Sequence, residues 1–251
     1  TSPFPPLDLM VHIGEISAAS FNDTIPAKEV WRVSEDGELR DPFKKLTTVF
    51  QMSEEMFFLH YGKDGCNRHV LIDECRELFG EIYEQIPELP FCNIWTAMQL
   101  SSRLPKGALF HMGVSNTRRC WNMFQLPESV ESACNVGCCG IDGCVSTLVG
   151  ASLVNPDRLC YVVVGDLTFF YDLNSLGNHH IGTNLRVMLV NNGRGTEFRL
   201  GIHHCNVFGD DADKYMAAAG HFGNKSPLLV KHYAEDLGFH YLSATTKEEF
   251  M

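Results

Sequence analysis

Two near-continuous apolar runs constrain the fold of this chain more than any other feature. Residues 158–166 (RLCYVVVGD) and 185–192 (LRVMLVNN) are rich in β-branched side chains, and each run ends abruptly on polar residues. Strands that are apolar on both faces are typical of parallel sheets covered by helices on both sides. Parallel strands need a crossover connection, and residues 171–181 (YDLNSLGNHHI) are predicted to form its helix.

The rest of the chain continues the alternation of strands and helices. A further buried strand is predicted at 107–113, with helices at 94–104, 140–152 and 226–238 and the start of a strand at 239–244. The N-terminal part is predicted to contain strands at 8–14 and 29–34 and a helix at 75–86 that Pro87 ends. We therefore predict an α/β fold, a parallel sheet with helices on both faces, preceded by a partial second α/β domain.

Three segments follow from this pattern. Residues 1–60 hold too few strands to make a complete domain, residues 61–90 are predicted to be a linker helix, and residues 91–251 form the main sheet domain. The chain begins on Thr1 and stops shortly after the start of a helix, so we expect a fragment of a longer polypeptide.

Composition narrows the classes of function. A formal net charge of −11 argues against nucleic acid as a partner, and no apolar stretch reaches the roughly 18 residues that a membrane span needs. The ten cysteines are irregularly spaced in mostly apolar surroundings, which favours buried thiols in a reducing, cytoplasmic compartment. His203, His204 and Cys205 are metal-ligand types, but three adjacent residues cannot all point at one ion.

Polar residues follow the predicted strands where a ligand is expected. Parallel sheets bind ligands at the carboxyl ends of their strands, and Asp166 and Asn192 end two strands that a single right-handed crossover would make neighbours. A carboxylate, an amide oxygen and a backbone carbonyl suit Mg²⁺. The alternative makes Asp166 a helix N-cap and Asn191 and Asn192 turn residues. The two elements together favour the metal.

Gly165-Asp166, followed after 24 residues by Asn191-Asn192, resembles the signature of thiamine-diphosphate-dependent enzymes. The segments NVGCCGIDGCVSTLVG (135–150) and LVNNGRGTEF (189–198) are similar to one branch of that superfamily, the menaquinone-pathway 2-succinyl-5-enolpyruvyl-6-hydroxy-3-cyclohexene-1-carboxylate synthases (MenD). Gly113-Val114-Ser115 with Arg119 resembles the family pattern GNS…R. By this resemblance, residues 1–60 are the end of the central, transhydrogenase-like domain and 91–251 the diphosphate- and Mg²⁺-binding domain, truncated at its C-terminus.

The resemblance implies two cofactors, thiamine diphosphate and Mg²⁺. Its implied metal ligands are the side chains of Asp166 and Asn192 and the carbonyl of Arg194. Its implied cofactor-binding residues also include Gly165, Leu167 and Thr168 at the diphosphate, and Gly140 and Ile141 at the aminopyrimidine and thiazolium, where Ile141 would hold the cofactor bent.

The implied activity is that of a transferase that decarboxylates a 2-oxo acid and forms a C–C bond, in menaquinone biosynthesis. The implied substrate residues are Ser115, Arg119, Val136, Glu197 and Phe198. Val136 stands where the family has an arginine, a second family arginine falls near Leu153, and Glu197 replaces an aliphatic residue. An acid at that position would repel a dicarboxylate. Arg118, Arg119 and Arg194 are the cations that could compensate.

The resemblance also implies partners. The glutamate that activates the cofactor belongs to an N-terminal pyrimidine-binding domain, of the same full-length chain or of a neighbouring subunit in a homodimer or tetramer. No catalytic residue is therefore assigned in this chain, which alone is expected to be inactive. Two alternatives stay open: a thiamine-diphosphate-dependent 2-oxo acid decarboxylase or acetolactate-synthase-like carboligase, and a catalytically idle assembly module.

Overall fold

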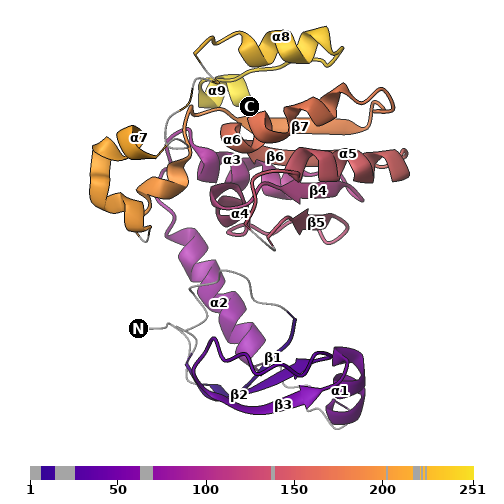
Figure 1. Ribbon diagram of the computed structural model, residues 1–251, viewed down its shortest axis with the longest axis vertical. Coiled ribbons are helices and arrows are strands. Elements are labelled where there is room, and N and C mark those ends of the chain that lie inside the picture. Colours follow the sequence, from indigo (N-terminus) through magenta and orange to yellow (C-terminus); the bar gives the residue numbers. More distant parts are fainter. Residues whose placement is uncertain are drawn as a thin grey trace. The chain divides into compact units, whose positions relative to one another are not determined.

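The two apolar runs lie side by side in a parallel sheet, the first as an inner strand and the second at the sheet's edge. The computed structural model describes residues 7–14, 26–62, 70–136, 139–201, 203–216, 221, 223 and 225–251. The chain divides into two units, Thr1–Pro87 and Glu88–Met251 (Figure 1). Within the described ranges no helix is both long enough and apolar enough to cross a membrane.

The first unit is built on a three-stranded parallel sheet in the order β1-β2-β3. Its elements are β1 (Leu7–His12), β2 (Ala27–Ser34), β3 (Leu46–Gln51), α1 (Glu54–Tyr61) and α2 (Val70–Glu84). The strands predicted at 8–14 and 29–34 are confirmed as β1 and β2, and α2 begins five residues before the predicted helix. Strand β3 and helix α1, which Ser53 caps by accepting a hydrogen bond from the Met56 amide, were not predicted.

The second unit contains a four-stranded sheet in the order β5-β4-β6-β7, with every neighbouring pair parallel. The strands are β4 (Leu109–Met112), β5 (Glu131–Cys134), β6 (Cys160–Gly165) and β7 (Leu185–Val190). Strand β6 is central, and its Val162, Val163 and Val164 are each buried. The α/β fold expected from the two apolar runs is confirmed.

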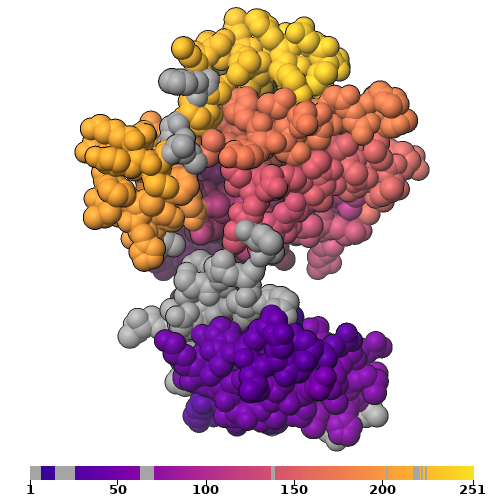
Figure 2. All heavy atoms as spheres, in the orientation of Figure 1, coloured from indigo at the N-terminus to yellow at the C-terminus, as the bar shows by residue number. Residues whose placement is uncertain are grey.

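Helices cover both faces of this sheet. They are α3 (Asn93–Leu100), α4 (Asn116–Trp121), α5 (Cys144–Val154), α6 (Asp166–Asp172), α7 (Ala212–Tyr215), α8 (Leu229–Asp236) and α9 (Lys247–Phe250), with 3₁₀ turns η2 (Ser101–Arg103), η3 (Leu173–Gly177), η4 (Thr196–Arg199) and η5 (His204–Asp211). On one face Phe110 of β4 packs on Trp121 of α4, with ring centroids 4.6 Å apart. Figure 2 shows η5 and α7 as an orange protrusion on this unit.

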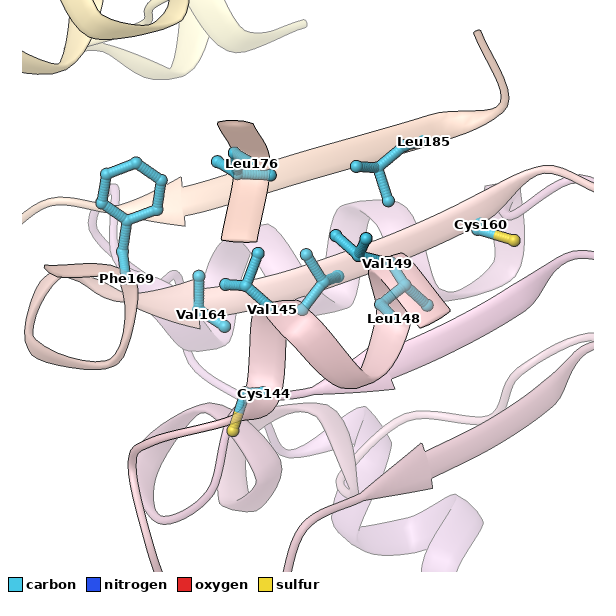
Figure 3. Packing of buried hydrophobic residues seen from close by; sticks show 10 residues of the cluster. Cys144, Val145, Leu148, Val149, Cys160, Val164, Phe169, Leu176 and Leu185 are labelled. Atoms are coloured by element: carbon cyan, nitrogen blue, oxygen red, sulfur yellow. The ribbon is translucent and has the colours of Figure 1, made fainter. Parts of the chain in front are cut away.

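The main hydrophobic core lies on the other face, between α5 and the sheet (Figure 3). Helix α5 contributes Val145, Leu148 and Val149, which pack over Val164 of β6 and Leu185 of β7. Cys144 and Cys160 are the two fully buried thiols of this cluster. Burying each of these side chains stabilises the fold by roughly 1.5–3 kcal/mol.

Three expectations need correction. The crossover helix begins five residues earlier than predicted, at Asp166 with Gly165 as its N-cap, and gives way to a 3₁₀ turn at Leu173. Residues 239–244 form no strand: α8 ends at Asp236, Gly238 follows in the left-handed region at φ 84°, and the next residues pair with no described strand. Of the eight described cysteines, all free, only two are buried.

The buried carboxylate of Asp172 links helix α6 to helix α5. Asp172, the last residue of α6, is 8% exposed and accepts a hydrogen bond of 2.7 Å from the Ser146 amide in the first turn of α5. The residue before α5 is Gly143, which has no side chain to cap the helix. Asp172 therefore supplies from α6 the acceptor that a local N-cap would supply.

We expect Asp172→Ala to lower the free energy of unfolding by about 0.5–2 kcal/mol, because it removes the side chain that accepts the Ser146 amide at the start of α5. Asp172→Asn retains an acceptor oxygen and should lose less. Urea denaturation followed by circular dichroism measures both. Asp157→Ala, at an exposed aspartate of the same unit, is the control. An Asp172→Ala protein as stable as this control would contradict the capping role.

Candidate functional site

The carboxyl ends of three neighbouring strands meet at one edge of the sheet. Strand β4 leads into Gly113, β6 into Asp166 and β7 into the loop 191–195. Gly113 permits close packing there, because a methyl group in its place would lie 3.3 Å from the Val163 carbonyl oxygen and from the Val164 Cα. The space beside Gly165 is open, with no atom within 4 Å of where such a methyl group would lie.

Asp166 links two of these strand ends. Its side chain is almost fully buried, at 2% exposure. One carboxylate oxygen, Oδ1, accepts the Leu167 amide at 2.8 Å, and the other, Oδ2, accepts the amide of Gly193 in the loop after β7. The single crossover between β6 and β7 thus brings Asp166 to the NNGRG loop.

One histidine faces this carboxylate. Nε2 of His221 lies 3.2 Å from Asp166 Oδ2, but the angle between the two groups does not satisfy hydrogen-bond geometry. Nδ1 of His221 accepts the Gly223 amide at 2.9 Å, which leaves Nε2 to carry the proton of the neutral ring. No arginine or lysine among the described residues forms an ion pair with Asp166. Sequence reasoning missed His221, since no motif surrounds it.

The other proposed metal ligands lie in the loop after β7. Asn192 and Arg194 are exposed, and the Asn192 side-chain oxygen accepts the Arg194 amide at 3.2 Å. Gly193, between them, has φ 79°, a conformation that glycine adopts without strain. Asn192 therefore forms a local turn in this structure, and Asp166 starts a helix. The turn that the alternative expects is present at Asn192, but its helix N-cap is wrong, because Gly165 is the N-cap of α6 and Asp166 is the first residue of the helix.

The loop from Asn135 to Gly143 carries the residues expected at the cofactor ring. Gly140, Ile141 and Val136 are all half-buried there. Asn135 closes the loop, since its side-chain amide donates to the Gly143 carbonyl at 3.2 Å and to Thr147 Oγ1 at 3.1 Å. Leu167 and Thr168, expected at the diphosphate, lie in the first turn of α6, half-buried and buried respectively.

Three of the expected substrate residues, Ser115, Arg119 and Glu197, lie together. Arg119 Nη1 lies 2.7 Å from Glu197 Oε2 and donates to Ser115 Oγ at 3.2 Å. Phe198 is half-buried beside His203, with ring centroids 5.1 Å apart.

Leu153 lies apart from Ser115, Arg119 and Glu197. It is exposed near the end of α5 that leads to the amino end of β6. This end of α5 lies away from the carboxyl edge, so Leu153 does not lie beside the other expected substrate residues.

The cysteines and histidines that the structure describes, His203, His204 and Cys205 included, form no metal-binding group. Among the described residues no group of three or more His, Cys, Asp or Glu side chains is placed to hold an ion. His203 Nδ1 instead accepts the Cys205 amide at 3.1 Å and caps η5. Burial raises the pKa of Cys134, at the end of β5, to about 11, so this thiol stays protonated at neutral pH.

Fold and site together define a parallel α/β protein with a buried carboxylate at the edge where such sheets bind ligands. No family model matches the chain. It is 38% identical over 179 residues to the 2-succinyl-5-enolpyruvyl-6-hydroxy-3-cyclohexene-1-carboxylate synthase of Bacteroides fragilis, a match covering 69% of this chain and 31% of that protein. The synthases of the same name from Bacteroides thetaiotaomicron (33% over 226 residues, 89% of this chain, 39% of that protein) and Phocaeicola vulgatus (31% over 232 residues, 89% and 38%) are also similar.

The chain therefore belongs to a MenD-like family, that of the 2-succinyl-5-enolpyruvyl-6-hydroxy-3-cyclohexene-1-carboxylate synthases. It spans between 31% and 39% of the length of these three curated relatives.

The buried histidine His111 forms a hydrogen bond with Asn135, the residue that closes the 135–143 loop. His111 of β4 is 4% exposed, and burial lowers its pKa, an effect that a hydrogen bond with Asn135 partly opposes. The folded chain therefore keeps His111 neutral where the unfolded chain, with a histidine pKa of about 6.5, binds a proton. Acidification below about pH 6.5 then favours unfolding, until the lower pKa of the folded state is reached.

We expect His111→Gln to flatten the loss of stability between about pH 6.5 and pH 5, where each pH unit costs the wild type up to about 1.4 kcal/mol from this group. Urea denaturation at several pH values measures the slope. His240→Gln, at an exposed histidine, should keep the wild-type slope. Equal slopes in the wild type and His111→Gln would contradict the assignment.

Proposed function

We propose that this chain is the diphosphate- and Mg²⁺-binding part of a thiamine-diphosphate-dependent synthase that decarboxylates a 2-oxo acid and forms a C–C bond. The observation that carries this proposal is Asp166, a buried carboxylate at the carboxyl edge that no described arginine or lysine neutralises. Burying an ionised carboxylate is costly unless a cation or several hydrogen bonds compensate. Membership in the synthase family adds independent support.

The residues at this edge fit Mg²⁺. Asp166 Oδ1 accepts a single hydrogen bond, from Leu167, and so keeps a lone pair for a metal. Asn192 offers an amide oxygen and Arg194 a backbone carbonyl in the loop whose Gly193 amide already contacts Asp166. All three are the hard oxygen donors that Mg²⁺ prefers. In this proposal they hold the ion.

Thiamine diphosphate supplies, when bound, a carbanion that attacks the 2-oxo acid and lets CO₂ leave. The chain's own part is to bind and orient. Gly165, Leu167 and Thr168 border the open space at the start of α6, where little side-chain bulk obstructs a diphosphate. Gly140 and Ile141 border the cofactor rings in this proposal, on a loop that Asn135 holds closed.

The proposal includes a partner. The chain contains no residue to which we assign activation of the cofactor, and we propose that a pyrimidine-binding domain, from the same polypeptide or a neighbouring subunit of a homo-oligomer, supplies that glutamate. The relatives extend well beyond the matched residues, which leaves room for such a domain.

A carboligase or simple decarboxylase acting on a 2-oxo acid is the second candidate. The observation that favours it is the Arg119–Glu197 ion pair, in which the Arg119 guanidinium is already engaged by a carboxylate of the protein. An idle assembly module would not require a buried carboxylate at Asp166 that no described arginine or lysine pairs with.

We expect Asp166→Ala to weaken Mg²⁺-dependent binding of thiamine diphosphate by about a hundredfold or more, because it removes the charged ligand. Asp166→Asn, which preserves the shape of the side chain, should show the same loss. Isothermal titration calorimetry on the chain together with its pyrimidine-binding domain measures this, with and without Mg²⁺.

Asp157→Ala provides the matched control, since Asp157 precedes the amino end of the same strand, β6. Its affinity should equal that of the wild type. Absence of Mg²⁺-dependent binding in the wild type would refute the proposed function, and wild-type affinity in Asp166→Asn would refute the metal assignment alone.

A further inference from the structure

One dipeptide in the loop after β7 is chemically labile. Asn192 is followed by Gly193, and this is the only Asn-Gly pair in the 251 residues of the sequence. Asparagine is a thermolabile residue, and a following glycine has no side chain to obstruct the approach of its own backbone nitrogen to the asparagine side chain. Asn192 is also exposed, so water reaches its amide.

The reaction open to this pair needs no reagent other than water. The Gly193 nitrogen attacks Asn192 Cγ, so that a N–Cγ bond forms and the Cγ–Nδ2 bond breaks. The amide proton of Gly193 leaves with Nδ2 as ammonia, and the chain is left with a cyclic succinimide. Water then adds to one of the two ring carbonyls and opens the ring, which produces an aspartate or an isoaspartate at position 192.

The attacking nitrogen is held by a buried carboxylate. The Gly193 amide donates to Asp166 Oδ2, and Asp166 is 2% exposed and also accepts the Leu167 amide in the first turn of α6. Attack requires the nitrogen to turn toward Asn192 Cγ and to give up its proton. Donation to a fixed acceptor opposes the turn, and the negative charge beside the nitrogen disfavours its deprotonated form.

The group under attack is held as well. Asn192 Oδ1 accepts the Arg194 amide at 3.2 Å, which keeps the side chain in a local turn. Gly193 lies between the two residues at φ 79°. Two reacting groups combine quickly only when they can reach an aligned geometry at close contact. Here separate hydrogen bonds restrain the nitrogen and the carbon that would have to meet.

We propose that Asn192 is a site of spontaneous succinimide formation and deamidation, and that Asp166 restrains this modification by holding the Gly193 amide. The inference does not depend on the proposed function. Deamidation would place a new carboxylate, or an additional backbone carbon, in the loop that Asp166 contacts. Like charges would then repel across this edge. The contact between Asp166 and Gly193 therefore preserves the chemical identity of the loop.

The test compares deamidation rates in the folded chain and in a synthetic peptide of residues 187–194, which trypsin also releases by cutting after Arg186 and Arg194. Both are incubated at mildly alkaline pH with EDTA, so that no cation contributes, and the products at Asn192 are measured by liquid chromatography and mass spectrometry. We expect the wild type to deamidate about tenfold or more slowly than the peptide. Asp166→Ala should remove most of this difference.

Asp172→Ala is the matched control, because Asp172 is another buried carboxylate of α6 but accepts the Ser146 amide instead. It should retain the wild-type rate.

Hydrogen exchange of the Gly193 amide in the wild type keeps the inference testable should Asp166→Ala fold poorly, and this amide should be protected. Three results would overturn the inference: a wild type that deamidates as fast as the peptide, an Asp166→Ala rate no higher than that of Asp172→Ala, or an unprotected Gly193 amide.

Discussion

The contact between the Asp166 carboxylate and the Gly193 amide is the interaction on which the candidate site depends. The parallel register of β6 and β7, from Cys160 opposite Leu185 to Gly165 opposite Val190, brings the ends of the two strands level. One crossover then suffices to set the carboxylate against the next loop. Burial of Asp166 would be costly without the amides of Leu167 and Gly193. Topology and polar contacts are therefore needed together.

Single polar contacts join the remaining loops of this edge in the same way. Helix α6 starts at Asp166 and ends at Asp172, whose carboxylate accepts a hydrogen bond from the Ser146 amide in the first turn of α5. Asn135 closes the loop that precedes α5, and Arg119 joins the β4 side to the β7 side. Each contact is worth about a kcal/mol or a few, but together they fix the loops before any ligand arrives, which is what a binding site on loops requires.

The sequence predicted the buried part of the fold and failed at its margins, for a physical reason. Strands β4, β6 and β7 were predicted because buried strands are apolar throughout. Edge strand β5 was missed because its Glu131, Ser132 and Ala133 are exposed and carry no such pattern. Residues 239–244 have an apolar pattern but no strand to pair with. A local apolar pattern indicates that residues are buried, but it does not indicate whether a neighbouring strand is available for pairing.

The site was predictable to the extent that topology fixes it. Asp166 and Asn192 could be predicted because each stands at the end of a predicted strand. His221 is 55 residues from Asp166 in the chain, and no sequence motif indicates that the two side chains meet. Arg119 and Glu197 were each singled out, as a possible anion receptor and a source of repulsion. The structure makes them one ion pair. Two acids of this edge thus have different partners: Glu197 pairs with an arginine, whereas Asp166 accepts two backbone amides and faces His221, and no described arginine or lysine pairs with it.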